Sequence, residues 1–394
     1  MNVTRRHALA TLALGAAAPV VLRGRYRLFA QSATTYSSRA VDLVKSSPVV
    51  DLLNQFQFPD YRVTPPKIDQ WLANPHTFTV EDAARYRDSG ITVFCLGEGE
   101  DNYDDAVKFM AQWNGFIAAN ADTFVRIDRA SDIAKAKAAG KIGIAITTQV
   151  SGHFRTPNDV DMFFGLGQRL SQLTYNFNNK IGSGFLETRD GGLSVFGASI
   201  QQRMEKVGMA VDVSHCGDQT TLDALAAATK PVVFSHANAR ALLPGHLRCK
   251  TDEAIQKMAK TGGVMGVNFI RFMVRNTEPV TIEHALDHVD YIAKLVGIEH
   301  VGIGSDLDVV GNPNAVGGRG FDPRGQPNFS RYQYHEGDGG AITVKGIDHV
   351  KRVFDLTEGL IRRGYSDANI RLVIGGNAAR VFGTIWPESA ATSR

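Results

Sequence analysis

Eight short apolar runs recur along this chain, and each is followed by a longer stretch with the spacing of an amphipathic helix. This alternation predicts parallel strands joined by crossover helices. Eight such units are the number that closes a (β/α)8 barrel, in which polar residues at the carboxyl ends of the strands form the active site. We therefore predict an α/β protein of the (β/α)8 TIM-barrel type. The predicted strands are Pro48 to Asn54, Ile91 to Leu96, Ile142 to Thr148, Leu170 to Asn176, Met209 to His215, Pro231 to His236, Gly262 to Asn268 and His300 to Asp306.

An open, doubly wound sheet is the alternative arrangement of the same elements. Such a sheet usually carries a glycine-rich turn after its first strand. The corresponding segment here is LLNQFQF, which contains no glycine. The barrel is therefore favoured over the open sheet.

Two of the predicted strands, MAVDVSH and PVVFSH, end in a histidine, at His215 and His236. A third, HVGIGSD, ends in Asp306. The carboxyl ends of barrel strands converge because the strands are parallel and tilted alike. Imidazole and carboxylate groups are good zinc ligands, so these three residues predict the rim of a metal-dependent hydrolase. The structural alternative is a pair of rim histidines that bond to neighbouring backbone.

Composition excludes several other classes of protein. The 394 residues are 43% hydrophobic and 21% charged, which suits folded α/β structure with a full core and excludes disorder as the main state. A net charge of +3 is too small for a nucleic-acid-binding protein. The three cysteines, Cys95, Cys216 and Cys249, do not form a disulfide framework. Chemistry on a small molecule is the expectation that remains.

Two further segments lie outside the predicted strands, one at the start of the chain and one after the last strand. Paired arginines, Arg5 and Arg6, precede an alanine-rich apolar stretch, which predicts a twin-arginine export signal over residues 1–30 and a periplasmic or other extracytoplasmic location. If the signal is not cleaved, it would tether the protein to a membrane. The single barrel is then expected over residues 31–394. Residues 311–340 are rich in Gly, Pro and Asn and follow the last strand, so they are predicted to form a lid over the barrel mouth.

From about Val49 to its end, the chain resembles the membrane dipeptidase (renal dipeptidase) family of metal-dependent amidohydrolase barrels. The resemblance lies in a series of segments in the family's order: LTYNFNN, GGLSVFG, VGMAVDVSH, PVVFSHANARAL, TGGVMGVNF, HVGIGSDLD and GGNAARVF. It implies a (β/α)8 barrel, two zinc ions joined by a bridging carboxylate, and hydrolysis of dipeptides or dipeptide-like amides. It is also the ground for expecting a homodimer.

The resemblance assigns roles to four residues. His215 and His236 match the two histidine ligands of one metal, and Asp306 matches the aspartate that contacts the other metal and handles the proton. Arg248 matches the arginine that holds the substrate carboxylate. A guanidinium can bind a carboxylate through two parallel hydrogen bonds, which supports this role independently. The alternative for Arg248 is a solvated surface charge.

Other positions depart from the family's pattern. Leu53 and Gln55 stand where the family has a His-x-Asp pair, and Gln149 (or Val150) stands where it has the bridging glutamate. Tyr175 replaces a substrate-binding histidine. Without these carboxylates the repulsion between two zinc ions is not offset. We therefore expect one zinc ion, held by His215, His236 and Asp306.

In such a site Asp306 would act as general base, and Tyr175 would donate a hydrogen bond to the developing oxyanion or pack as a rim aromatic. Gln149, Asn176 and Asn268 are predicted to bind the substrate with Arg248, in an amide-rich rim that also includes Asn54 and Gln55. His153 and His335 are candidate replacement ligands. His284, His288 and Cys216 are expected to have structural roles.

The leading hypothesis is a dipeptidase-like metallohydrolase that cleaves small dipeptides or dipeptide-like amides. Two alternatives stay open: a catalytically inactive barrel that binds a peptide or amide, and an exported maturation factor that positions a peptide intermediate for another enzyme.

Overall fold

Eight parallel strands close into a barrel in the computed structural model, which describes residues 25–26, 35–56, 67–311 and 344–388. The strand order is β4-β3-β11-β10-β9-β8-β7-β6, and pairing of β4 with β6 closes the circle. The predicted (β/α)8 barrel is confirmed, and each predicted run overlaps one of its strands. These are β3 (Val50–Asn54), β4 (Val93–Leu96), β6 (Ile142–Thr148), β7 (Gln168–Gln172), β8 (Ala210–Asp212), β9 (Val232–Ala237), β10 (Val264–Val267) and β11 (Val301–Ile303).

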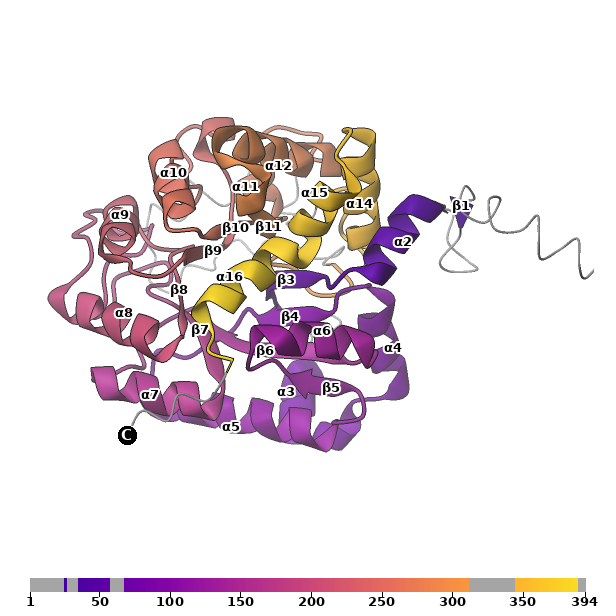
Figure 1. The fold of residues 1–394 in the computed structure, drawn as a ribbon. Coiled ribbons are helices and arrows are strands. Elements are labelled where there is room, and N and C mark those ends of the chain that lie inside the picture. Colours follow the sequence, from indigo (N-terminus) through magenta and orange to yellow (C-terminus); the bar gives the residue numbers. More distant parts are fainter. Residues whose placement is uncertain (1–24, 27–34, 57–66, 312–343, 389–394) are drawn as a thin grey trace, which may run out of the picture.

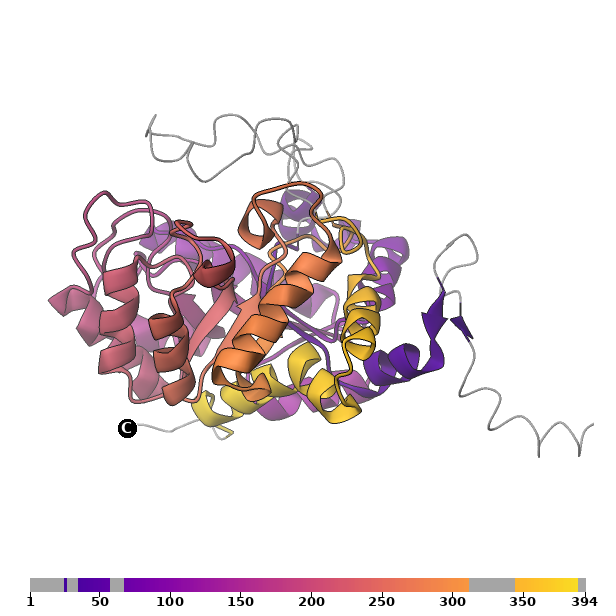
Figure 2. The same cartoon turned by 90° about the horizontal axis from the view of Figure 1, so that it is seen from above.

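Helices surround the strands, and α2 lies beside α14 at the outer edge of the barrel (Figures 1 and 2). The longest helices, α5 and α12, have buried apolar residues on the side that faces the barrel. The helices are α2 (Ser38–Ser46), α3 (Lys67–Ala73), α4 (Val80–Asp88), α5 (Tyr103–Ala119), α6 (Ala130–Ala138), α7 (Pro157–Leu166), α8 (Val195–Val207), α9 (Asp218–Ala227), α10 (Asp252–Lys260), α11 (Arg271–Val274), α12 (Ile282–Val296), α14 (Arg352–Arg362), α15 (Asp367–Arg371) and α16 (Asn377–Ile385).

The ends of two helices follow directly from sequence signals. Thr281 and His284 form a capping box at the start of α12, which ends before Gly297. Ser366 caps α15 by accepting a hydrogen bond from the backbone N–H of Asn369 at 3.2 Å. Side chains of this kind satisfy backbone donors that have no partner within the helix. In both cases the capping residue is a serine or threonine directly before the helix, which is a local sequence signal.

Sequence reasoning missed one parallel strand, β5 (Phe124–Arg126), which pairs with the first half of β6. Its residues are FVR, too short and too polar at the end to stand out as an apolar run. A separate antiparallel pair joins β1 (Arg25–Tyr26) to β2 (Tyr36–Ser37). Neither pair alters the closure of the eight-stranded barrel.

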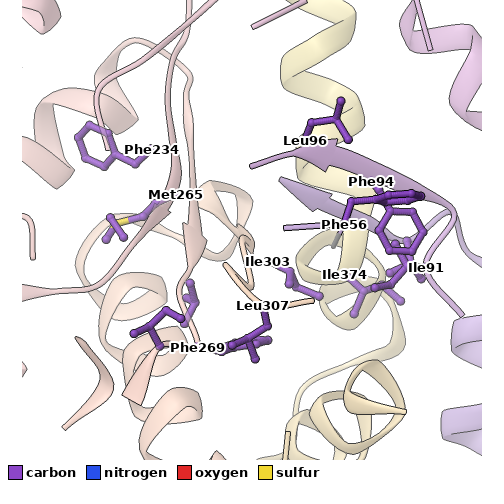
Figure 3. Close-up of a cluster of buried hydrophobic side chains, with 14 of the residues drawn as sticks. Phe56, Ile91, Phe94, Leu96, Phe234, Met265, Phe269, Ile303, Leu307 and Ile374 are labelled. Carbon is purple, nitrogen blue, oxygen red and sulfur yellow. The ribbon is translucent and has the colours of Figure 1, made fainter. Parts of the chain in front are cut away.

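Aromatic and aliphatic side chains fill the space between strands and helices (Figure 3). Phe56, just after β3, stacks on Tyr86 of α4 with ring centroids 4.3 Å apart, and it meets Phe94 of β4 edge-on. On another side, Phe234, Met265 and Phe269 pack around β9 and β10. This packing fixes the strand ends, and therefore the rim residues, against the outer helices.

Substitutions at two glycines test this packing. A Cβ at Gly304, just after β11, would lie 1.8 Å from the Ser235 carbonyl oxygen and 3.0 Å from the Cα of His236. Gly304→Ala is therefore expected to lower the free energy of unfolding by about 1–3 kcal/mol or more.

A Cβ at Gly115, in α5, would meet nothing within 4 Å. Gly115→Ala should instead raise the free energy of unfolding by about 0.5–1 kcal/mol, since it removes backbone entropy from the unfolded chain. Urea unfolding of the two variants measures both, and equal stability would contradict the described contact.

Two predicted segments lie outside the described residues. They are most of the export signal over residues 1–30 and nearly all of the lid over residues 311–340. Both stay predictions. Within the part of the chain that is described, no helix has the length and apolar character needed to cross a membrane.

Candidate functional site

His215 and His236 meet at the carboxyl ends of β8 and β9. Their Nε2 atoms are 2.9 Å apart, and both residues are buried. His236 lies within β9, while His215 lies three residues beyond the end of β8. The predicted convergence of these two side chains is therefore present in the fold.

A serine and an aspartate set the tautomer of His236. Ser235 Oγ donates to Asp212 Oδ2, so it can only accept from the Nδ1–H of His236, at 2.7 Å. Asp212 also accepts hydrogen bonds from the backbone N–H groups of Ser214 and Ser235, at 2.9 and 3.1 Å. With the proton on Nδ1, Nε2 of His236 presents a lone pair to the rim. This relay resembles the outer partners that orient metal-bound histidines.

The side-chain amide of Asn176 sets the tautomer of His215. Asn176 Oδ1 lies 2.7 Å from Nδ1, and an amide oxygen only accepts, so Nδ1 carries the proton. Nε2 of His215 then also presents a lone pair. Burial lowers the pKa of both histidines well below the usual range, and the positive charge of Arg248 acts in the same direction. Two neutral rings thus direct two lone pairs at each other, an arrangement that a cation between them would stabilise.

Asp306 is the acidic group of the rim. It has a φ of 58°, in the left-handed region that residues with a side chain rarely adopt, and such strain is concentrated at functional sites. Gln55 Nε2 donates to Oδ1 at 2.6 Å, and Asn268 Nδ2 donates to Oδ2 at 3.0 Å. Burial raises its pKa to about 6, although Arg248 and the two amides oppose the rise. The carboxyl group is therefore poised for proton transfer near neutral pH.

Arg248 and Tyr175 lie beside these groups. Arg248 is buried, and its guanidinium donates to the carbonyl oxygens of Ser214 at 2.6 Å and His236 at 2.9 Å. It is therefore not the solvated surface charge considered above. The ring of Tyr175 stacks on His215 with centroids 4.4 Å apart, and 40% of the residue is exposed. Desolvation and the nearby Asp306 carboxylate raise the pKa of Tyr175 to about 12, so its hydroxyl stays protonated.

Leu53, Gln55 and Gln149 carry neither an imidazole nor a carboxylate. Where the resemblance implies ligands of a second metal, Leu53 is buried and apolar, Gln55 donates to Asp306, and Gln149 Nε2 donates to the Gly97 carbonyl. No group of three His, Cys, Asp or Glu side chains with metal-binding geometry occurs in residues 25–26, 35–56, 67–311 and 344–388. Asp306 as a third metal ligand therefore stays a prediction. Within the described residues, His215 and His236 bring two imidazole nitrogens together at the rim.

The other candidates have roles within the fold. His288 is buried, with Nδ1 accepting from the Ala239 N–H at 3.2 Å and Nε2 lying 3.0 Å from the Val274 carbonyl. Nε2 of His153 lies 3.3 Å from Gln168 Oε1. Asn54 donates to Asp51 at 3.0 Å and accepts from the Phe56 N–H at 3.1 Å, so it holds the turn after β3. Cys216 is buried, and burial raises the pKa of its thiol. His335 lies outside the described residues.

Sequence reasoning missed Asp212 and Ser235, which hold His236. Both lie inside apolar runs, as the aspartate of MAVDVSH and the serine of PVVFSH. A carboxylate in the middle of a buried strand needs hydrogen-bond donors, and this was the available signal. The amide oxygen of Asn176 is bonded to His215. The role of Asn176 in substrate binding stays a prediction.

Comparison with known proteins gives a consistent assignment. Residues 38–318 and 335–393 match the model of the family "Membrane dipeptidase (Peptidase family M19)". A dipeptidase, tcpJ, of Claviceps purpurea is 26% identical over 315 residues, which cover 75% of this chain and 65% of that protein. This chain spans less than two thirds of the length of three curated relatives that it matches.

Two crystal structures share the fold over most of their length. An amidohydrolase from Pseudomonas aeruginosa has a TM-score of 0.72 at 28% identity, with 88% of this chain and 99% of that chain aligned. A metallopeptidase from Rhodobacter sphaeroides, solved with a phosphinate mimic of the dipeptide L-Ala-D-Ala, has a TM-score of 0.67 at 18% identity, with 86% and 99% aligned. The second likeness bears on the fold alone. Because the family model matches most of the sequence, the chain belongs to the membrane dipeptidase family.

Proposed function

We propose that this protein is a hydrolase of dipeptides or dipeptide-like amides that uses a single metal ion held by His215 and His236. One observation carries the proposal: the two Nε2 atoms lie 2.9 Å apart while both Nδ1 atoms are bonded to other side chains. This leaves two lone pairs for one cation. The membrane dipeptidase family, to which the chain belongs, is metal-dependent. A curated dipeptidase is similar to the chain over 315 residues.

The chain's own residues supply the remaining functions. Bound at the histidine pair, a divalent metal would polarise the scissile carbonyl and lower the pKa of a bound water to about 7. Asp306, held by Gln55 and Asn268, would accept the proton of the attacking water and return it to the leaving amine. Tyr175, protonated at neutral pH, would donate a hydrogen bond to the developing oxyanion.

Arg248 is proposed to bind the substrate carboxylate. A guanidinium has N–H donors on three nitrogens, and the carbonyls of Ser214 and His236 hold it in one orientation. A fixed, buried cation next to the histidine pair favours substrates with a free carboxylate near the scissile bond. Dipeptides and N-acyl amino acids both have this feature.

A binding protein without catalytic activity is the second candidate. It is favoured by the environment of Asp306, whose two oxygens accept from neutral amides, and by the lack of a third metal ligand in the described part of the chain. Under this alternative the pocket would retain a dipeptide unchanged. Mass spectrometry of dipeptides incubated with the metal-loaded protein separates the two: cleavage supports the hydrolase, and recovery of intact, bound dipeptide supports the binding protein.

Removal of the Asn176 amide tests the orientation of His215. Asn176→Ala is expected to weaken metal binding about 10- to 100-fold. The Nδ1–H of His215 would lose its acceptor, so the proton would no longer be fixed on Nδ1 and the lone pair no longer fixed on Nε2. Asn176→Asp, which keeps an acceptor at the same place, should restore most of the affinity. Competition with a metal-binding dye measures both variants. Unchanged affinity in Asn176→Ala would show that Asn176 does not orient the ring.

A further inference from the structure

A cavity of about 490 Å³ opens on the side of the barrel away from the rim. It is lined by Ile91 and Thr92, which lead into β4, and by Ile142, the first residue of β6, so it lies at the amino-terminal ends of these strands. The histidine pair lies at the carboxyl ends of β8 and β9. The cavity is therefore distinct from the candidate metal site. Its volume falls within the usual range for small-molecule pockets.

The charge of its lining is strongly unbalanced. Five cationic side chains and one carboxylate line the cavity, although the whole chain carries a net charge of only +3. The cations come from α2, from the ends of α4 and α6, from the turn before β6, and from the residue before α14. They are Lys45, Arg87, Lys137, Lys141 and Lys351, and the carboxylate is Asp88.

Part of this charge has a structural role. Lys137 Nζ donates to the Val44 carbonyl at the end of α2, at 3.1 Å, and Lys141 Nζ donates to the Ala121 carbonyl at 2.8 Å. Lysines near the carboxyl ends of helices offset the partial negative charge there. Each of these ammonium groups has three N–H donors, however, and the hydrogen bond described above occupies one of the three.

The positive charge is only partly compensated. Within the described residues no carboxylate forms a salt bridge with Lys137 or Lys141. Lys351 Nζ donates to the backbone carbonyl of Asp88 and lies 4.0 Å from the carboxylate of the same residue. Burial lowers the pKa of Lys137 and Lys351, and the charge of Lys45 acts in the same direction on Lys351. A bound anion would stabilise both ammonium groups.

The shape of the cavity depends on Gly90. Its φ is +78°, and a Cβ there would lie 2.7 Å from Val44 Cγ1 and 3.1 Å from Phe354. A larger residue would therefore push the cavity walls apart. The cavity is a concave, shaped site rather than a flat basic surface.

We propose that this cavity is a binding site for a phosphate-bearing ligand, formed by Lys45, Arg87, Lys137, Lys141 and Lys351. A phosphate group matches several positive charges that line one cavity, and the volume has room for an organic group attached to it. The phosphate can belong to a soluble compound or to a lipid headgroup. Because the site lies at the opposite ends of the strands, occupancy by a phosphate does not require the metal site.

Calorimetric titration of the full chain with inorganic pyrophosphate at physiological salt tests the proposal. Binding is expected, and Lys137→Gln and Lys141→Gln should each weaken it roughly fivefold or more, since each removes one close charge. Lys135→Gln is the matched control, because Lys135 lies on the same helix, pairs with Asp132 at 2.9 Å and does not line the cavity. Thermal unfolding of each variant shows whether the fold is retained.

Two further arms identify the source of the phosphate and the place of binding. Flotation with phosphatidylcholine vesicles, with and without phosphatidylglycerol, detects headgroup binding, and a requirement for phosphatidylglycerol that is lost in the two cavity variants would also support the site. The double variant His215→Ala, His236→Ala should bind pyrophosphate as the wild type does. Loss of binding in that variant, an equal loss in Lys135→Gln, or binding of neither probe would overturn the proposal.

Discussion

His215→Ala is expected to lower the rate of dipeptide hydrolysis by about 10³-fold or more and to abolish stoichiometric metal binding. The substitution removes one of two lone pairs that lie 2.9 Å apart, and a single remaining imidazole is a weak ligand. His236→Ala should have the same effect, because each histidine alone cannot hold the ion. The measurement is kcat/KM for the best substrate in a dipeptide panel, with metal content determined on the same samples.

A variant that lacks both histidines tests whether the two residues act together. Residues that act as one unit have non-additive effects, so His215→Ala, His236→Ala should be no worse than either single variant. His76→Ala is the control, since His76 is exposed in a short helix before α4 and far from β8 and β9 in the barrel. If the double variant kept wild-type activity, metal-assisted hydrolysis at this pair would be wrong.

A second metal ion is expected to bind when three side chains are exchanged for those that the family pattern has at these positions. The triple variant Leu53→His, Gln55→Asp, Gln149→Glu supplies one imidazole and two carboxylates, whose negative charge offsets the second dication. Metal content should rise from about one to about two ions per chain. Zinc should also raise the melting temperature of this variant more than that of the wild type, because the new carboxylate at position 55 would repel Asp306 without metal.

A neutral variant separates ligand charge from packing effects. Leu53→Asn, Gln55→Asn changes the same strand end but adds no carboxylate, and it should keep about one ion per chain. If the triple variant folds and still binds a single ion, then the presence of Leu53, Gln55 and Gln149 in this chain does not explain the binding of one metal ion instead of two.

The barrel could be predicted because nearly every predicted strand combines a short apolar run with a polar end, and this signal is local. β5 was missed because its three residues carry too little apolar pattern, and its pairing with β6 depends on tertiary contact. The helix caps at Thr281 and Ser366 were also predictable, since a side chain three residues from its backbone partner is a local signal.

The site could be predicted only in part. His215 and His236 were identified because strand ends of a parallel barrel must converge. The relay from Asp212 through Ser235 to His236 could not be derived, because it joins side chains of two strands whose register the sequence does not state. The hydrogen bond between Gln55 and Asp306 could not be derived either, because it joins residues 251 positions apart. The basic cavity was missed for the same reason, since its cations come from segments that are distant in sequence.

The central claim is that one metal ion binds at His215 and His236, and elemental analysis of the purified full chain tests it most directly. Zinc, manganese and iron would be counted per chain after incubation with excess metal and removal of the unbound fraction. The account predicts about one ion per chain in the wild type and none in His215→Ala, His236→Ala. Two ions in the wild type, or none, would contradict it.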